Sequence, residues 1–238
     1  MSSKNGGQDF KPALVIVDFQ NDFCPPNGSL AVQGGRDIAP IVNSLLGLPF
    51  VIKVATKDFH PQNHISFASN HGPPDNKPFE SMVTIKNPEN SHETETTRLW
   101  PDHCVQGTPG SDLVDELDVS KCDHILEKGQ DARVEMYSAF AAPFSNPPIA
   151  VSDLARLLKD KSVTHVFTVG LAYDYCVKCT AIDSVKEGFT TYIIKDASRP
   201  VHTEPDAISA TEEELRRNNV HIVTSDGPEI TRVKQLST

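Results

Sequence analysis

Short apolar runs alternate along the chain with segments whose apolar residues have helical spacing. The runs that predict buried strands cover residues 12–17, 50–55, 124–128, 163–169, 190–194 and 220–223. The segments that predict helices cover residues 38–46, 111–117, 151–161, 177–186 and 206–218. Because strands and helices alternate, we expect an α/β fold: a doubly wound, mainly parallel six-stranded sheet of Rossmann-like topology with helices on both faces.

The segment between residues 56 and 110 interrupts this alternation. It holds many of the histidines and prolines and few periodic apolar runs, which is typical of functional or disordered loops. Within it, residues 72–97 are mostly polar and are expected to form a surface insertion. Residues 1–9 are polar and are expected to be frayed. The chain of 238 residues otherwise fits a single domain, residues 1–238, with a substantial core.

The charge and cysteine content limit the partners and the compartment. A formal net charge of -10 argues against binding to nucleic acid or to an anionic membrane surface. No apolar run approaches the roughly 20 residues of a membrane span, and no secretory signal is expected. Five scattered cysteines fit free thiols in a reducing compartment. We therefore expect a cytoplasmic protein, with the nucleus or the peroxisome as alternatives.

Chemically active side chains follow four of the predicted strands. The first strand ends at Asp18, the second leads to Asp58 and His60, the third ends at Lys128, and the fourth leads to Cys176. In open α/β sheets the active crevice lies beyond the carboxyl ends of the strands. We therefore expect a carboxylate, a candidate pair of metal ligands, an ammonium and a thiol at one edge of the sheet.

Cys176 is predicted to lie at the start of a helix. The positive end of a helix dipole favours an anion there and is expected to lower the pKa of the thiol. Asp18 could then accept the thiol proton, while Lys128 would stabilise the thiolate and keep Asp18 ionised. Taken singly, the three residues also fit a buried cysteine, a capping carboxylate and a solvated strand end. Their joint arrival at one edge favours the catalytic interpretation.

A second group of polar side chains offers ligands for a metal. Asp58 and His60 are separated by one residue, and His64 and His103 follow in the same histidine-rich segment. Carboxylate and neutral imidazole ligands suit Zn²⁺, Fe²⁺ or Mn²⁺. A histidine-bearing surface loop without a metal is the alternative, since the spacing alone is a weak signal.

Five motifs together resemble one family of enzymes. They are Asp18-Phe19-Gln20-Asn21-Asp22-Phe23, Lys57-Asp58-Phe59-His60-Pro61, Trp100-Pro101-Asp102-His103-Cys104, Lys128-Gly129, and Gly170-Leu171-Ala172-Tyr173-Asp174-Tyr175-Cys176-Val177. In this order and spacing, they resemble the nicotinamidases of the isochorismatase-like cysteine hydrolase superfamily, over about residues 12–225. The polar insertion resembles the fungal or other eukaryotic branch of that family.

The resemblance implies hydrolysis of nicotinamide to nicotinic acid and ammonia in NAD salvage. Cys176 would attack the carboxamide and form a thioester, with Asp18 as general base and then acid and Lys128 as the third member of the triad. It also implies a cis peptide bond between Leu171 and Ala172. The backbone amides of Ala172 and Cys176 would then form the oxyanion hole.

The resemblance further implies one divalent metal ion held by Asp58, His60 and His103, with His64 as the candidate for a fourth ligand. Zinc is the expected ion, with Fe²⁺ or Mn²⁺ as alternatives, and it would orient the pyridine ring through the ring nitrogen.

Three aromatic residues, Phe23, Trp100 and Tyr137, match the positions that enclose this flat ring in the family. Ordinary core packing is the alternative for Phe23 and Trp100. Tyr175, which precedes the nucleophile, is a departure from some bacterial relatives, which have histidine there.

Two other functions remain open from the sequence. Another small-amide or isochorismate hydrolase of the superfamily would share the triad, although the metal ligands disfavour it. A catalytically inactive ligand-binding protein could have the same fold. Formation of a homo-oligomer is also left open. The remaining cysteines are expected to be structural: Cys24, Cys104, Cys122 and Cys179.

Overall fold

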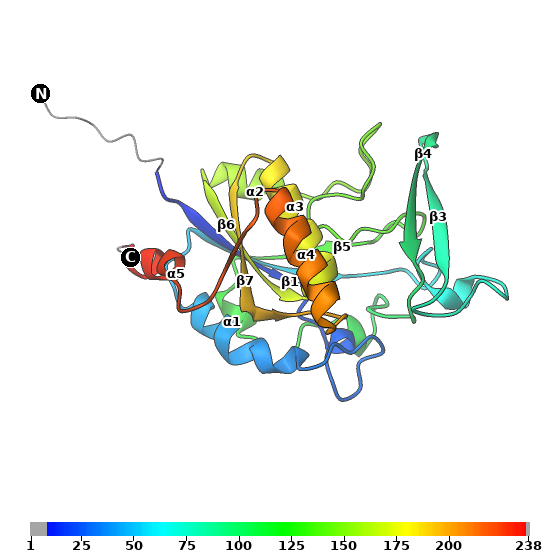
Figure 1. Ribbon diagram of the computed structural model, residues 1–238, viewed down its shortest axis with the longest axis horizontal. Coiled ribbons are helices and arrows are strands. Elements are labelled where there is room, and N and C mark those ends of the chain that lie inside the picture. Colours follow the sequence, from blue (N-terminus) through cyan, green and yellow to red (C-terminus); the bar gives the residue numbers. More distant parts are fainter. Residues whose placement is uncertain (1–8, 237–238) are drawn as a thin grey trace, which may run out of the picture.

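A computed structural model describes residues 9–236 of the chain. Within these residues the main sheet has six strands, all parallel, in the order β5-β2-β1-β6-β7-β8 (Figure 1). The strands are β1 (Pro12–Val17), β2 (Ile52–Asp58), β5 (His124–Lys128), β6 (His165–Leu171), β7 (Thr190–Arg199) and β8 (His221–Val223). The predicted parallel sheet is therefore confirmed, with strand positions close to the expected ones. The part of the predicted frayed segment that covers residues 1–8 lies outside the described residues.

Helices cover both faces of the sheet, as predicted. The helices are α1 (Ala39–Leu46), α2 (Leu154–Asp160), α3 (Lys178–Lys186), α4 (Pro205–Arg217) and α5 (Pro228–Lys234). None of these helices, within residues 9–236, has the length and apolar character needed to cross a membrane. The C-terminal helix α5 is an element that the periodicity did not predict.

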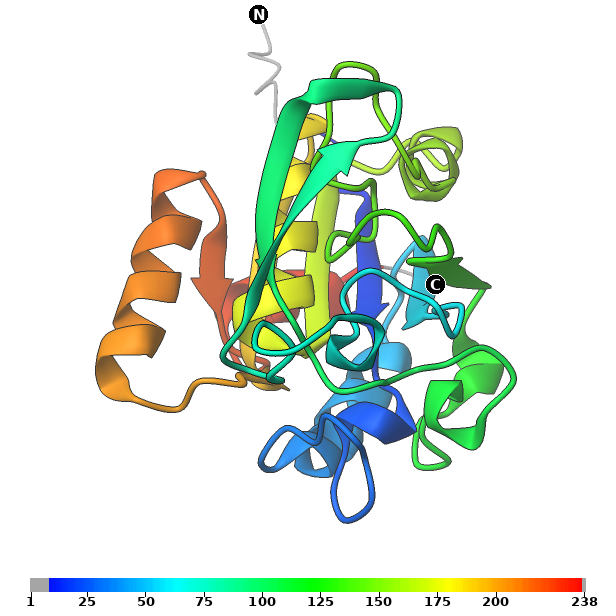
Figure 2. The ribbon, with the colours of Figure 1, turned by 90° about the vertical axis from the view of Figure 1, so that its right-hand side faces the viewer.

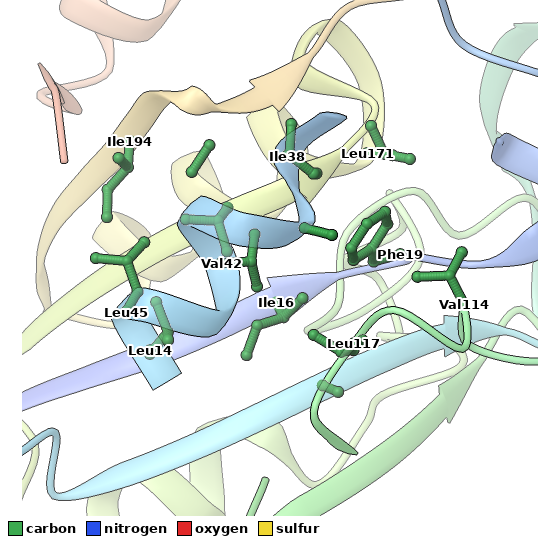
Figure 3. Close-up of a cluster of buried hydrophobic side chains, with 14 of the residues drawn as sticks. Leu14, Ile16, Phe19, Ile38, Val42, Leu45, Val114, Leu117, Leu171 and Ile194 are labelled. Atoms are coloured by element: carbon green, nitrogen blue, oxygen red, sulfur yellow. The ribbon is translucent and has the colours of Figure 1, made fainter. Parts of the chain in front are cut away.

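The alternation of side chains along β1 separates two hydrophobic cores. Leu14 and Ile16 point to the face that α1 and α5 cover, where they join Val42 and Leu45 (Figure 3). Residues Ala13, Val15 and Val17 point to the other face, against α2, α3 and α4. Every residue of β1 and β6 is buried, because helices cover both faces of these central strands. They fix the sheet edge from which the functional side chains project.

The segment 111–117 is not a helix, so that prediction is wrong. A short 3₁₀ turn, Pro109–Ser111, is followed by a single bridge residue, Leu113, and a turn at residues 115–116. The backbone here pairs with the segment after β1: the Val114 N–H donates to the Phe19 carbonyl, and Leu113 bridges Gln20. Long-range main-chain pairing has replaced the local bonds that a helix would have made.

The polar stretch 72–97 contains much of a β-hairpin, formed by β3 (Met82–Asn87) and β4 (Asn90–Arg98). The hairpin stands apart from the main sheet in Figure 1 and crosses in front of it in Figure 2. Most of its side chains are exposed, but Ile85 packs with Val134, Met136 and Phe144 in a third hydrophobic cluster. This cluster ties the hairpin to residues 134–150, a segment that also lines the candidate site.

Candidate active site

Four strand ends deliver their charged or reactive side chains to a single buried point. The Lys128 ammonium lies 2.9 Å from Asp18 Oδ2, 2.6 Å from Asp58 Oδ1 and 3.7 Å from Cys176 Sγ. It also donates to the Met136 carbonyl, at 3.0 Å. The strand order places β5, β2, β1 and β6 side by side, which explains why residues so distant in sequence meet here.

The hydrogen bonds of Lys128 leave one oxygen of Asp18 available. An ammonium has three protons, and the neighbours placed to accept them are Asp58, the Met136 carbonyl and Cys176. Asp18 Oδ2 therefore meets Lys128 as an ion pair and has no hydrogen-bond partner among the described residues. A carboxylate oxygen of Asp18 lies within 4.8 Å of Cys176 Sγ, which is close enough for the carboxylate to receive the thiol proton.

Thr56 orients the Asp18 carboxylate. Its hydroxyl donates to Asp18 Oδ1 at 2.7 Å, and its carbonyl and hydroxyl oxygens both face the Asp18 N–H. Asp18 has a φ of 48°, an uncommon conformation for a residue other than glycine. Burial raises the pKa of Asp18 to about 6, against the lowering effect of Lys128. The carboxyl group is therefore mostly ionised at pH 7 and can act as a base.

Cys176 lies in one wide helical turn, Tyr173–Val177, which leads directly into α3. Burial raises the pKa of its thiol well above 9, although Lys128 lowers it. The expectation of a lowered thiol pKa is therefore wrong for the resting protein, because loss of water outweighs the helix dipole. The thiol is neutral at rest and needs the adjacent base, Asp18.

The peptide bond between Leu171 and Ala172 is cis, which confirms the expectation from the resemblance. Ala172 and Cys176 both line one small pocket at the carboxyl edge of the sheet. Leu171 is the last residue of β6 and packs in the core of the α1 face.

Asp58, His60 and His103 come together beside the same pocket, which Asp58 and His103 line. Their ligand atoms lie within 4.8 Å of one another, and all three side chains are buried. His60 Nδ1 lies 2.8 Å from the Gly129 carbonyl, and His103 Nδ1 lies 2.7 Å from the Pro101 carbonyl. A carbonyl only accepts, so each Nδ1 carries the proton and each Nε2 can bind a metal.

The protonation states of His60 and His103 are also compatible with binding a metal cation. Burial lowers the pKa of His103 to about 4, which keeps its imidazole neutral. Burial acts in the same direction on His60, but Asp58 raises the pKa of that imidazole above its usual value, so a metal would displace a proton there. His60 Nε2 is buried and has no hydrogen-bond partner within residues 9–236. These observations make the three residues a fitting ligand set for a divalent metal.

Gly129 allows the His60 ring to approach the chain closely. A Cβ at this position would lie 2.5 Å from His60 Cε1, well inside van der Waals contact. The φ of Gly129 is also 67°, which side chains rarely adopt. A glycine after Lys128 is therefore required by the geometry of the ligand beside it.

His64 lies beside these ligands without joining them. Its ring centroid lies 4.1 Å from that of His60, with the two rings tilted by 33°. However, Nδ1 lies 2.8 Å from Ser66 Oγ and Nε2 lies 3.1 Å from the Val134 carbonyl. Both ring nitrogens thus have protein partners. Glu135 also lines the pocket, and its buried Oε2 has no partner among the described residues. Its only sequence signal is a single charge between Val134 and Met136.

The predicted aromatic residues form walls of this pocket. Phe23, Trp100 and Tyr137 all line it. The Tyr137 hydroxyl accepts a hydrogen bond from Trp100 Nε1 at 2.8 Å, which locks the two rings together. Tyr175 adds a further wall, with its ring perpendicular to Trp100 at 5.0 Å and its hydroxyl 3.0 Å from His202 Nε2.

A larger groove lies elsewhere, along the outer edge of β5. Its lining includes Lys57, Ile125 and Arg156, and it contains none of the predicted site residues. The chemistry of the chain is therefore concentrated in the smaller pocket.

The family of the chain follows from its sequence as a whole. A family model described as "Isochorismatase domain" matches residues 12–226. The chain belongs to the isochorismatase family. Among its relatives, a nicotinamidase of Saccharomyces cerevisiae is 36% identical over 217 residues, which cover 88% of this chain and 98% of the relative.

Solved structures of the isochorismatase family agree with this fold. The yeast nicotinamidase bound to the inhibitor nicotinaldehyde has a TM-score of 0.83 and 36% identity, covering 90% of this chain and 99% of that one. A pyrazinamidase of Pyrococcus horikoshii in complex with zinc has a TM-score of 0.67 and 33% identity, covering 90% and 99%.

Proposed function

We propose that this protein is a nicotinamidase, which hydrolyses the amide of nicotinamide to nicotinic acid and ammonia. The observation that carries the proposal is the convergence of a nucleophile, a base and a metal-ligand set on one aromatic pocket. Three relatives named nicotinamidase, matched over 81% to 99% of their length, support the same substrate class. A role in NAD salvage follows from this reaction.

The reaction begins at Cys176. Asp18 Oδ2 takes the thiol proton as Sγ attacks the carboxamide carbon, and Lys128 stabilises the sulfur as it gains charge. The backbone amides of Ala172 and Cys176 are proposed to stabilise the oxygen of the tetrahedral intermediate. Asp18 then gives its proton to the departing nitrogen, the C–N bond breaks, and ammonia leaves a thioester on Cys176.

The second half of the reaction uses Asp18 again. It removes a proton from a water molecule that attacks the thioester carbon, and returns that proton to Sγ as the C–S bond breaks. Nicotinic acid and the free thiol result, so the atoms and protons balance over one cycle. The buried position of Asp18, with its pKa of about 6, suits both roles near neutral pH.

The proposed metal would orient the substrate. Asp58, His60 and His103 would hold it, and we propose the Glu135 carboxylate, which lines the same pocket, as a further ligand. When bound, the metal supplies a Lewis-acid position for the ring nitrogen. Two imidazoles and a carboxylate favour Zn²⁺, with Fe²⁺ and Mn²⁺ as alternatives. Phe23, Trp100 and Tyr137 would enclose the ring.

The test is ammonia release from nicotinamide by protein of known metal content, with Cys176→Ala as the control. We expect turnover by the wild type and a loss of at least about 10⁴-fold in the variant. Benzamide, which lacks the ring nitrogen, should be a much poorer substrate of the metal-loaded enzyme. Absence of wild-type turnover would favour a ligand-binding protein, and faster hydrolysis of another small amide or of isochorismate would favour a different hydrolase. Cytoplasmic location and homo-oligomer formation remain predictions from the sequence.

A further inference from the structure

Gln20, two residues after Asp18, holds the backbone of a proposed metal ligand. Its side chain is fully buried. Nε2 donates to the Asp58 carbonyl at 2.8 Å, and Oε1 accepts from the Asp58 N–H at 2.8 Å. The same Nε2 donates to the Ser111 carbonyl at 2.9 Å. One side-chain amide thus clamps both main-chain groups of Asp58, at the point where β2 ends.

Asp22 holds the turn that carries a second proposed ligand. Its Oδ2 accepts the Cys104 N–H at 2.7 Å, directly after His103. Cys104 has a φ of 46°, so this turn has an uncommon backbone conformation for a residue other than glycine. The charged acceptor fixes this conformation by a hydrogen bond stronger than a neutral one.

The turn at Cys104 also controls the third ligand. The His60 N–H donates to the Cys104 carbonyl at 3.0 Å, and the Gln106 N–H donates to the His60 carbonyl at 2.8 Å. His60 and Val105 form a parallel bridge. Whatever fixes the backbone of Cys104 therefore also fixes the backbone of His60.

Gly110 leaves the space in which the Asp22 carboxylate lies. A Cβ at this position would lie 2.1 to 2.5 Å from the three carboxylate atoms. Only glycine at position 110 therefore leaves room for the Asp22 carboxylate.

We propose that Gln20 and Asp22 are positioning residues that set the geometry of the metal site. Gln20 acts on Asp58, whereas Asp22 acts on His103 and, through the turn, on His60. Three ligands on two separate segments of the chain are thereby held by one short segment that itself follows the general base, Asp18. This inference rests on the proposed metal site, but it makes a separate claim about what orders that site.

The principal test compares Asp22→Ala and Gly110→Ala with Asn21→Ala. Asn21 lies between the two positioning residues, and its side chain donates to the Pro109 carbonyl, away from the ligand backbones. The affinity for Zn²⁺ is measured by competition with a chromogenic chelator. The rate of Cys176 alkylation by iodoacetamide in metal-free protein reports on the triad.

We expect Asp22→Ala and Gly110→Ala to weaken Zn²⁺ binding by about 10 to 100-fold, the range for residues that orient metal ligands. Alkylation of Cys176 should change by less than about twofold, and Asn21→Ala should change neither quantity. Gly110→Ala keeps the carboxylate but displaces it, so it distinguishes the position of Asp22 from its charge. Asp22→Asn retains an oxygen acceptor without the charge and should show a smaller loss.

Gln20 is tested with Gln20→Glu, which has nearly the same shape but places an oxygen against the Asp58 and Ser111 carbonyls. It should weaken Zn²⁺ binding at least as much as Gln20→Ala. Variants that bind Zn²⁺ as tightly as the wild type would overturn the proposal, as would a parallel loss of thiol reactivity, which would indicate general disorder. These results leave the nicotinamidase assignment intact, since that depends on wild-type turnover. A wild type that binds no divalent metal would overturn the inference and the metal part of the proposed function together.

Discussion

Charge holds the triad side of the pocket together, whereas hydrogen bonds to main-chain atoms hold the metal side. On the triad side, one buried ammonium, Lys128, contacts two carboxylates and a thiol. On the metal side, His60 and His103 each bond a carbonyl through Nδ1. Asp58 belongs to both sides, because it pairs with Lys128 and groups with the two histidines.

The difference follows from where each group is carried. Asp18 and Lys128 lie at the ends of paired parallel strands, so the sheet fixes their backbone positions. His103 lies on a long loop, where local contacts must fix the ligand atoms. Loss of a charge on the triad side should therefore lower both the catalytic rate and the stability of the fold. Substitutions on the metal side should mainly alter the orientation of the bound substrate.

Among the substitutions that test this difference between the triad side and the metal side, Lys128→Met is expected to have the largest effect. It leaves two carboxylates buried near each other without their cation, so we expect a loss of about 3–5 kcal/mol in the free energy of unfolding. We also expect kcat/KM for nicotinamide to fall by at least about 10³-fold, because the thiolate loses its counter-charge. Urea unfolding and ammonia release measure the two effects.

Lys159→Met is the matched control for that substitution. Lys159 pairs with Glu187 at 2.6 Å, but on the surface of α2. Such exposed pairs contribute about 0–1 kcal/mol. If both lysine variants lost similar stability, the proposed dominance of buried charge on the triad side would be wrong.

Removal of the metal should affect binding more than the chemical steps. Exhaustive chelation is expected to raise KM for nicotinamide by about 10 to 100-fold, the cost of a lost orienting contact of a few kcal/mol. The alkylation rate of Cys176 should change little, because Lys128 and Asp18 remain in place. Steady-state kinetics before and after Zn²⁺ is restored measure this. An unchanged KM would contradict the orienting role.

The pH dependence should report on the base. Asp18 must be ionised to accept the thiol proton, and burial raises its pKa to about 6. As the pH falls below this value, the carboxyl group becomes protonated and kcat/KM should fall about tenfold per pH unit. At pH 5 the expected loss is thus about tenfold relative to pH 7. A profile of kcat/KM that stays flat down to pH 5 would indicate a different base.

The smallest effect is expected for Tyr137→Phe. It removes the hydroxyl that accepts from Trp100 Nε1 and also bonds Thr97, leaving two buried partners unsatisfied. We expect a loss of about 1–3 kcal/mol in stability and a KM raised several-fold, with kcat nearly unchanged. Tyr192→Phe, whose ring stacks on Phe167 far from the pocket, is the control. Equal changes in KM for the two variants would contradict the pocket role of Tyr137.

Several features of the site could be predicted because parallel strands share one carboxyl edge. The apolar runs located the strands, and Asp18, Asp58 and Lys128 follow or end them directly. Their convergence then depends only on the strands being neighbours. The resemblance added the cis bond at Ala172, which the structure confirms.

Other features could not be read from local patterns. The helix expected at 111–117 is replaced by pairing with the segment after β1, because distant main-chain groups compete with local ones. The hairpin in the polar insertion lacks a strong apolar alternation, because only part of it packs on the third cluster. The lowered thiol pKa predicted for Cys176 was wrong because burial depends on all the surrounding elements.

The sequence by itself determined the sheet, the family and the identity of the reactive side chains. These depend on local apolar periodicity and on motifs within single segments. Only the tertiary structure decided which atoms meet: Lys128 with both Asp18 and Asp58, His64 beside the ligands, and Glu135 facing the pocket. It also decided the charge states, since burial and neighbouring charges set a pKa only once the chain has folded.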